Sequence, residues 1–423
     1  MGIYNLLGQS TNYIDFAVET IGAKNLNWIG KIIQGLIEGV GIIGLGIILF
    51  TIILKTVVLP LDIYSRYKMK KQSLLMKAMR PQMEKLQKQY ANDKQMYNQK
   101  VMELQKAHGI SMFGACIPMI VSLVIFIVVF NAFSTYSQYA NLQSYNGMVE
   151  KYNASVAQYV LTDENTEGFL IETTDDSLLI VTQDGVKGTA AYLVDFDKFL
   201  EWAESEHKFS AEEKQAFIDA NEAGKMETVR KFVRENAGQA SAAYYREHKN
   251  NFLWVKNIWY PDSLLNKEIP KFSDFSSSIS RATGSGLSTS YQESYEAVTA
   301  YLTPENKTYN GYFILIVLAI GLMFLQQFIS MRMQKDTNDL STVDGSGART
   351  NKWMLILMPL IYGVFSFFYS AAFSTYMITN TVYGLLTTVI LNKIMNVRFA
   401  KKEASGELFQ PKKRKTINRK RLK

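Results

Sequence analysis

The stretch from Gly39 to Asp62 constrains this chain most, because it is apolar over enough residues to cross a bilayer and has Lys55 inside it. About 20 apolar residues span a hydrocarbon core of roughly 30 Å. A lysine near the centre of such a helix costs about 2.5–3.5 kcal/mol on insertion scales. The stretch therefore predicts a transmembrane helix whose buried charge calls for a function.

Hydrophobic residues make up 48% of the 423 residues and fall in a few long blocks. That distribution is typical of an α-helical, polytopic membrane protein. Residues 353–392 carry no charge and are long enough for two crossings, with a predicted turn at Ser370–Thr375. The five predicted transmembrane helices occupy residues 39–62, 111–135, 310–332, 353–372 and 374–394.

The charges are divided between regions. Lys and Arg outnumber Asp and Glu by eleven to three over 66–110 and by eleven to two over 395–423, whereas 137–309 holds sixteen against twenty-six. Because short basic loops stay cytoplasmic, we expect the N-terminus outside and the C-terminus in the cytoplasm. The single Cys116 excludes an internal disulfide, and the N-terminus lacks the pattern of a cleaved secretory signal.

Two segments on either side of the first span read as helical. Residues 1–38 form an amphipathic extracytoplasmic segment, which either lies at the membrane interface or packs against the helix bundle. Residues 63–110 predict a cytoplasmic helical hairpin with a turn at Asn92 and Asp93 and a second helix over Lys94–Ala107. The hairpin is either a solvated spacer or a docking arm for clients.

An inserted extracytoplasmic α+β domain is predicted over 136–250. Alternating residues predict short strands at Phe169–Thr173 and within Leu178–Val194, and helices follow, one of them opened by a capping box of Ser210 and Glu213. Residues 251–309 read as an aromatic interfacial segment followed by a flexible Ser/Gly-rich linker at Ser276–Ser290. Residues 333–352 are a cytoplasmic loop.

The cytoplasmic tail, 395–423, is strongly basic. Such a run binds either anionic lipids of the inner leaflet or the polyphosphate backbone of ribosomal RNA, and composition alone favours lipid. The candidate contact residues are Lys412, Lys413, Arg414, Lys415, Arg419, Lys420 and Arg421.

Polar residues inside the spans are the candidate functional groups. Thr51 lies one helical turn before Lys55, the other spans contain further polar side chains, and no Asp or Glu lies within any span. Intramembrane polar groups normally face the bundle interior or a wet cavity, so a groove with one positive charge is predicted. The alternative is a lysine that snorkels among Ser, Thr and Gln contacts between helices.

No nucleotide-binding loop, metal-ligand spacing or catalytic triad is present, so we expect neither enzymatic activity nor a cofactor. Two rival functions remain open. In an anion channel or small-solute transporter Lys55 would select the anion, and in a scaffold protein the spans would only anchor the acidic domain.

Several motifs together resemble one known family, the YidC family of membrane-protein insertases. They occur in order over roughly 40–135 and 250–395 and read TIILKTVVLPL, KAMRPQMEKLQKQYANDKQ, GACIPMIVSLVIF, FLWVKNIW, FLQQFIS and YMITN. The resemblance implies a five-helix core in a bacterial cytoplasmic membrane, with a hydrophilic groove open to lipid and cytoplasm. It also implies nascent membrane proteins as clients, and the ribosome and the Sec translocon as further partners.

By this resemblance Lys55 stands where the family usually has an arginine, and Thr51, Gln327 and Tyr376 fall at polar groove positions. Lysine keeps the positive charge but lacks the planar fork of arginine. The acidic inserted domain has no usual counterpart in the family, so the resemblance implies nothing about its role.

Overall fold

The computed structural model divides the chain into two units, each of which is described by itself. The first unit consists of Met1–Ile32 and Phe133–Tyr312, and the second of Ile33–Ala132 and Phe313–Lys423. The structure describes residues 13–16, 18–108, 117–173, 179–182, 185–188, 191–206, 208–284, 287–333, 357, 359–361 and 363–405.

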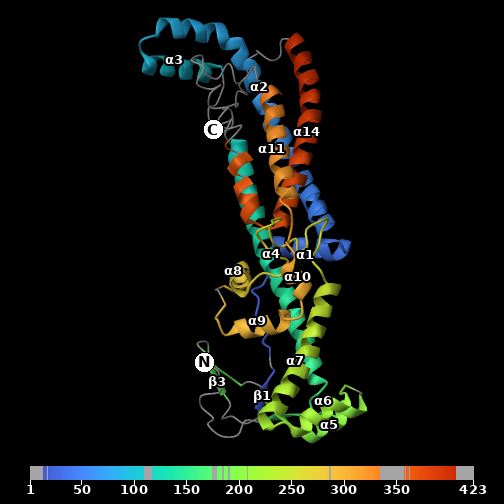
Figure 1. Ribbon diagram of the computed structural model, residues 1–423. Coiled ribbons are helices and arrows are strands. Elements are labelled where there is room, and N and C mark those ends of the chain that lie inside the picture. Colours follow the sequence, from blue (N-terminus) through green and yellow to red (C-terminus); the bar gives the residue numbers. More distant parts are fainter. Residues whose placement is uncertain are drawn as a thin grey trace, which may run out of the picture. The chain divides into compact units, whose positions relative to one another are not determined.

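Long helices dominate the second unit (Figure 1). Within the described residues, two are long and apolar enough to cross a membrane, namely α2 and the stretch Ile314–Arg332 of α11. The predicted spans at 111–135 and 353–372 lie partly outside the described residues, so the count of five spans stays a prediction. The helices of this unit, two of which continue into the first, are α1 (Trp28–Val40), α2 (Ile43–Gln89), α3 (Lys94–Ala107), α4 (Ile117–Ala157), α11 (Ile314–Met333) and α14 (Ala371–Ala404).

Helix α2 is much longer than the predicted span at 39–62. It begins after a break at Gly41, where φ is +73°, and runs through Pro60 and Pro81 to Gln89. The residues of the predicted span and those of the first predicted helix of the hairpin therefore belong to one continuous helix. A proline removes one backbone hydrogen bond and kinks a helix, but flanking packing can keep the helix continuous.

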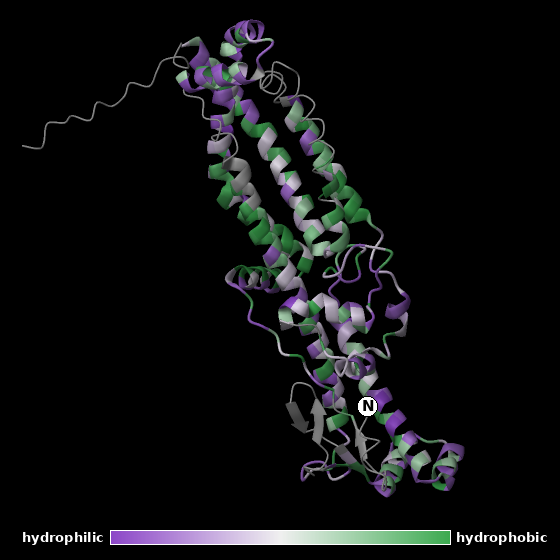
Figure 2. Cartoon of the chain, turned by 90° about the vertical axis from the view of Figure 1, so that its left-hand side faces the viewer, coloured by the Kyte–Doolittle hydropathy of each residue, from purple (hydrophilic) through white to green (hydrophobic). Residues whose placement is uncertain are grey.

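The predicted hairpin is confirmed at the far end of α2. Helix α3 spans Lys94–Ala107 as expected, and the Asp93 carboxylate caps it by accepting from the Met96 N–H. Three buried methionines of α2 (Met76, Met79 and Met83) pack against Leu104 and its neighbours on α3. Figure 2 shows the hydrophilic colouring of the hairpin and the hydrophobic colouring along the long helices of this unit.

Helix α14 packs against both α2 and α11. It begins at Ala371 directly after Ser370, so the turn before it is shorter than the predicted Ser370–Thr375. Near this end, Phe130 of α4 forms edge-to-face contacts with Tyr369 and Phe373, with ring centroids 4.5 and 5.2 Å apart. This aromatic cluster joins α4 to the start of α14.

The first unit contains two small antiparallel sheets. The three-stranded sheet has the order β1–β5–β2, with Tyr13 opposite Leu193 and Leu170 opposite Val194. Strands β3 and β4 pair as the predicted hairpin. The strand bounds are β1 (Tyr13–Asp15), β2 (Leu170–Thr173), β3 (Leu179–Thr182), β4 (Gly185–Gly188) and β5 (Ala191–Val194).

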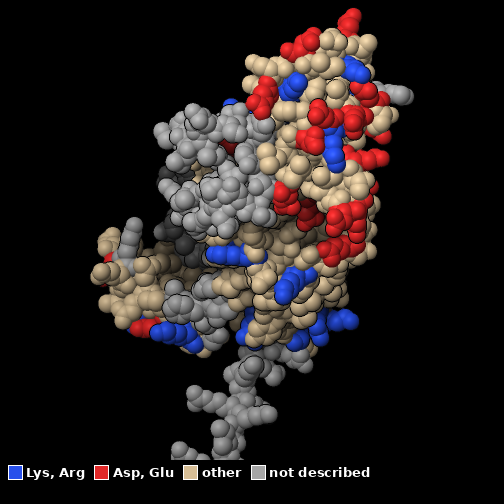
Figure 3. Space-filling model, turned by 90° about the horizontal axis from the view of Figure 1, so that it is seen from below, with Lys and Arg blue, Asp and Glu red and all other residues tan. Residues whose placement is uncertain are grey.

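Helices cover this sheet and share one core with it. The capping box of Ser210 and Glu213 is confirmed at the start of α6. Figure 3 shows acidic side chains crowded over one part of the molecular face drawn there, as expected for a region rich in Asp and Glu. The helices are α5 (Phe196–Ser205), α6 (Ala211–Asp219), α7 (Glu222–Glu247), α8 (Phe272–Thr283), α9 (Tyr291–Thr299) and α10 (Thr303–Lys307).

The predicted flexible linker is wrong for most of its length. Residues from Ser276 onward continue α8, which buries Phe275, Ile279 and Ala282 on one face and ends at Gly284 with φ +91°. These residues belong to the same core as Phe199 and Val233, so the predicted border at residue 250 does not divide two folding units. The many serines of this stretch favoured a linker in the sequence analysis. Three buried side chains on one face are nevertheless enough to stabilise a helix here.

The described residues of the N-terminal segment before Trp28 form strand β1 and irregular structure rather than a helix, and α1 begins at Trp28. Phe16, Val18 and Ile21 are buried in the core of the first unit. Two asparagines of α4 hold the backbone: Asn153 exchanges two hydrogen bonds with Val18, and Asn146 exchanges two with Ile21. The side-chain amides thus make the backbone hydrogen bonds that a neighbouring strand would otherwise provide. Sequence periodicity cannot predict such an arrangement.

Candidate functional site

Helix α2 places Thr51 and Lys55 one turn apart in the second unit. Thr51 is fully buried, and its hydroxyl donates to the Ile47 carbonyl oxygen at 2.7 Å. Lys55 is half-buried and forms neither a hydrogen bond nor an ion pair with any residue that the structure describes. A cation in that state attracts anionic groups more strongly than one in bulk water.

The other two predicted groove residues lie on α14 and α11. Tyr376 is buried on α14, and Gln327 is half-buried on α11. The preceding residue, Gln326, has its amide against Gly384 of α14. Because α14 packs against both α2 and α11, the helices that carry the four predicted residues form one packed set.

Polar contacts between α2 and α14 were missed in the sequence. The Thr56 and Tyr383 hydroxyl oxygens are 3.2 Å apart. Nearer the hairpin, Arg66 donates to the Thr388 hydroxyl at 2.8 Å. Its position beside Lys55 could have singled out Thr56 as a candidate residue. No local sequence pattern, however, pairs it with Tyr383, which is 327 positions away.

A row of buried hydroxyls runs along α14. Ser374, Thr381 and Thr388 are spaced by seven residues and are almost inaccessible, so they share one face. The Ser374 and Thr381 hydroxyls have no hydrogen-bond partner within the described residues. A buried unpaired hydroxyl costs about 1–3 kcal/mol of stability. The buried face of α14 is therefore polar in spite of this cost.

The only carboxylate close to this region along α2 is already engaged. Asp62 lies seven residues after Lys55, and its Oδ2 accepts from the Arg66 Nε at 3.1 Å. Among the described residues, no carboxylate lies within ion-pair distance of Lys55. The tail residues Lys412 to Lys415 and Arg419 to Arg421 lie outside the described residues.

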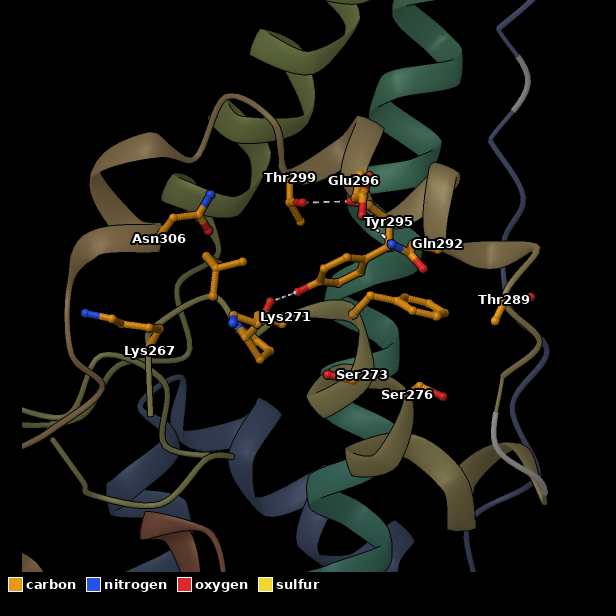
Figure 4. Close-up of a pocket in the computed structure, with 13 residues that line it drawn as sticks. Lys267, Lys271, Ser273, Ser276, Thr289, Gln292, Tyr295, Glu296, Thr299 and Asn306 are labelled. Carbon is orange, nitrogen blue, oxygen red and sulfur yellow. Dashed lines mark hydrogen bonds between the residues drawn. The ribbon is translucent and has the colours of Figure 1, made fainter. Parts of the chain in front are cut away.

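A separate pocket of about 780 Å³ lies in the first unit, between the start of α8 and helices α9 and α10 (Figure 4). Tyr295 forms part of its wall and donates to the Pro270 carbonyl oxygen at 2.6 Å. The ammonium of Lys267 donates to the Lys307 carbonyl oxygen and lies 3.5 Å from the centre of the Tyr309 ring. The polar atoms of Tyr295 and Lys267 are thus already engaged within the fold.

One family model matches most of the chain. The model of the 60Kd inner membrane protein family matches residues 35–169 and 236–400. The chain belongs to this family. The matched regions contain α2, α3, α4 and α11, the second half of α1, most of α14 and the residues Thr51, Lys55, Gln327 and Tyr376. Residues 170–235, which hold β2 to β5, α5, α6 and the first half of α7, lie outside the match.

Individual relatives of this family member match over shorter segments. The membrane protein insertase YidC of Fusobacterium nucleatum is 42% identical over 72 residues, which are 17% of this chain and 33% of that protein. The protein of the same name from Caldanaerobacter subterraneus is 33% identical over 113 residues, 27% of this chain and 53% of that protein. The aligned segments thus span from a third to about half of these two relatives, and no solved structure matches.

Proposed function

We propose that this protein is a membrane-protein insertase of a bacterial cytoplasmic membrane. Its second unit would accept nascent hydrophobic segments beside a hydrophilic, positively charged intramembrane groove and release them laterally into the bilayer. The observation that carries the proposal is Lys55, a half-buried cation without a described partner in a family member whose named relatives are membrane protein insertases.

The proposed mechanism is non-covalent and requires no cofactor. Lys55 attracts an acidic part of the client, and Thr51, Gln327, Tyr376 and the α14 hydroxyls keep water in the groove beside it. Apolar client side chains then move into lipid, where each buried CH₂ contributes about 0.8 kcal/mol. A client helix of 20 apolar residues gains enough from this transfer to leave the groove without nucleotide hydrolysis.

The proposed topology follows from charge. The N-terminus and the first unit lie outside, and the hairpin of α2 and α3 and the basic tail lie in the cytoplasm. The hairpin is then placed to meet clients, and the tail to meet the ribosome or anionic lipids. The Sec translocon is a further proposed partner.

The mechanism is tested by replacing Lys55 in cells depleted of the native protein. We expect Lys55→Arg to restore growth, Lys55→Ala to restore it partly, and Lys55→Glu to restore it least, because the last repels acidic client segments. Val57→Ala, two residues away at an exposed position of α2, is the matched control and should restore growth. Full rescue by Lys55→Glu would contradict charge attraction, and anion flux through liposomes without any client would favour a channel.

The tail is tested by truncation after Glu407. Removing the seven basic residues from Lys412 to Arg421 should abolish salt-sensitive co-sedimentation with ribosomes, since a polyphosphate backbone binds such runs through counterion release. Unchanged co-sedimentation would assign the tail to lipid binding instead. Insertion of a client by purified protein in liposomes should persist in the truncated chain.

A further inference from the structure

Three charged residues of α2 lie on one face of the helix. Asp62 is seven residues after Lys55, about 20° short of two turns, and Arg66 is eleven residues after it, about 20° beyond three turns. At 1.5 Å per residue, Arg66 lies about 16 Å from Lys55 along the helix axis, toward the hairpin. Lys55 and Arg66 therefore lie on one stripe of the helix surface.

Two hydrogen bonds hold Arg66 in place but use only part of its N–H donors. Its Nε donates to Asp62 at 3.1 Å, and its Nη2 donates to the Thr388 hydroxyl at 2.8 Å. Thr388 in turn donates to the Gly384 carbonyl oxygen at 2.6 Å, which orients its oxygen. A guanidinium has five N–H donors, and those not used here have no hydrogen-bond partner among the described residues.

The pairing with Asp62 is weak enough to be exchanged. Both side chains are partly exposed, 29% for Arg66 and 42% for Asp62, and they are four residues apart on one helix. Exposed pairs of this kind contribute little to stability. An incoming carboxylate can therefore bind the N–H groups of Arg66 that are not used here or compete with Asp62 for the guanidinium.

We propose that Arg66 is an entry site for carboxylates of client polypeptides, from which an acidic segment moves along the stripe to Lys55. Thr388 orients the guanidinium, and Asp62 competes with the client so that the acidic segment is captured briefly and then released. This inference rests on the proposed insertase function and assigns a specificity for acidic clients to residues that the sequence did not single out.

The test uses full-length protein in liposomes of uncharged lipid and two forms of one client, with an acidic or a neutral translocated tail. We expect Arg66→Gln to slow insertion of the acidic-tail client by about tenfold, the size of an electrostatic steering effect, and to leave the neutral-tail client unchanged. Asp62→Asn should speed capture of the acidic-tail client, as measured by crosslinking.

Thr388→Val separates steering from packing. This variant removes the hydrogen bond between Arg66 and Thr388 but keeps the charge of Arg66, so it should retain most of the preference for the acidic-tail client. Equal slowing of both clients by Arg66→Gln and by Thr388→Val would mean that Arg66 only joins the helices, and would overturn the inference. If Lys55→Gln impairs insertion of the acidic-tail client while Arg66→Gln does not, the role of Arg66 is wrong but the insertase proposal stands. If the native protein inserts neither client, the insertase proposal itself is wrong.

Discussion

The two units of this chain distribute their side chains in opposite ways. The first unit buries large aromatic residues such as Tyr145, Tyr152 and Phe199 and has most of its charged residues on its surface. The second leaves large apolar side chains exposed, among them Val57 at 73% and Val317 at 66%, and buries hydroxyls. An apolar exterior around a polar interior is the distribution expected in lipid, whereas the first unit has the distribution expected in water.

The buried charges show the same contrast. In the first unit Glu268 is 2% exposed and accepts hydrogen bonds from Lys249 and Tyr245, so its charge is compensated within the fold. In the second unit Lys55 is half-buried and has no such partner among the described residues. A charge that a fold pairs directly specifies structure, while one without a direct hydrogen bond or ion pair can bind a ligand.

Deleting a core aromatic should give the largest difference between the units. Phe199 is fully buried and packs on Phe169 and Phe217, with ring centroids 4.9 and 5.3 Å apart. Phe199→Ala should cost about 3–5 kcal/mol because it leaves a cavity. Leu386→Ala, at an exposed position of α14, is the matched control and should cost far less in detergent. Hydrogen exchange of α5 and α14 amides measures both, and equal losses would remove the contrast between the units.

Two helical glycines give a smaller difference. A Cβ at Gly238 would overlap the ring of Tyr301, whereas one at Gly384 would meet only the end of the flexible Gln326 side chain. Gly238→Ala should therefore destabilise the first unit by about 1–3 kcal/mol through overpacking. Gly384→Ala should be close to neutral, since Gln326 can move and alanine favours the helix. Thermal unfolding of both variants measures the two losses of stability. A larger loss for Gly384→Ala than for Gly238→Ala would contradict the prediction.

Acid should affect the first unit through Glu305. The hydrogen bond from Arg246 lowers the pKa of this carboxyl below its usual value, roughly 4.3. Its contribution to stability is therefore present above pH of about 4.3 and is lost as the pH falls through the lower, folded-state pKa. Glu305→Gln should flatten the loss of α7 and α10 protection below that pH, as followed by hydrogen exchange. An unchanged acid profile would show that other carboxyls govern it.

Much of the second unit could be predicted from the sequence because its elements are specified locally. The uninterrupted apolar blocks located α2, α11 and α14, and the turn at Asp93 fixed the boundary of α3 to the residue. Lys55 was identified as a candidate because a charge inside an apolar block is visible without any tertiary information. The continuity of α2 through Pro60 was not visible, since packing overrides a single proline.

The candidate site was only partly predictable for the same reason. Thr51 and Lys55 are neighbours on one turn, but the contacts of Arg66 with Thr388 and of Thr56 with Tyr383 join residues more than 320 positions apart. The family resemblance pointed to Gln327, and the structure also places the adjacent Gln326 against Gly384 of α14. Adjacent residues differ by about 100° around a helix, so only the packing of α11 decides which one faces its neighbour.

The sequence by itself determined the apolar blocks, the position of Lys55, the hairpin and the charge asymmetry between regions. Only the tertiary structure decided that Val18 and Ile21 lie against Asn153 and Asn146, that residues from Ser276 onward continue a helix, and that Arg66 has Asp62 and Thr388 as partners. The physical reason is range: hydropathy and helical periodicity act between neighbours, whereas these side-chain hydrogen bonds and buried faces exist only after distant segments have packed.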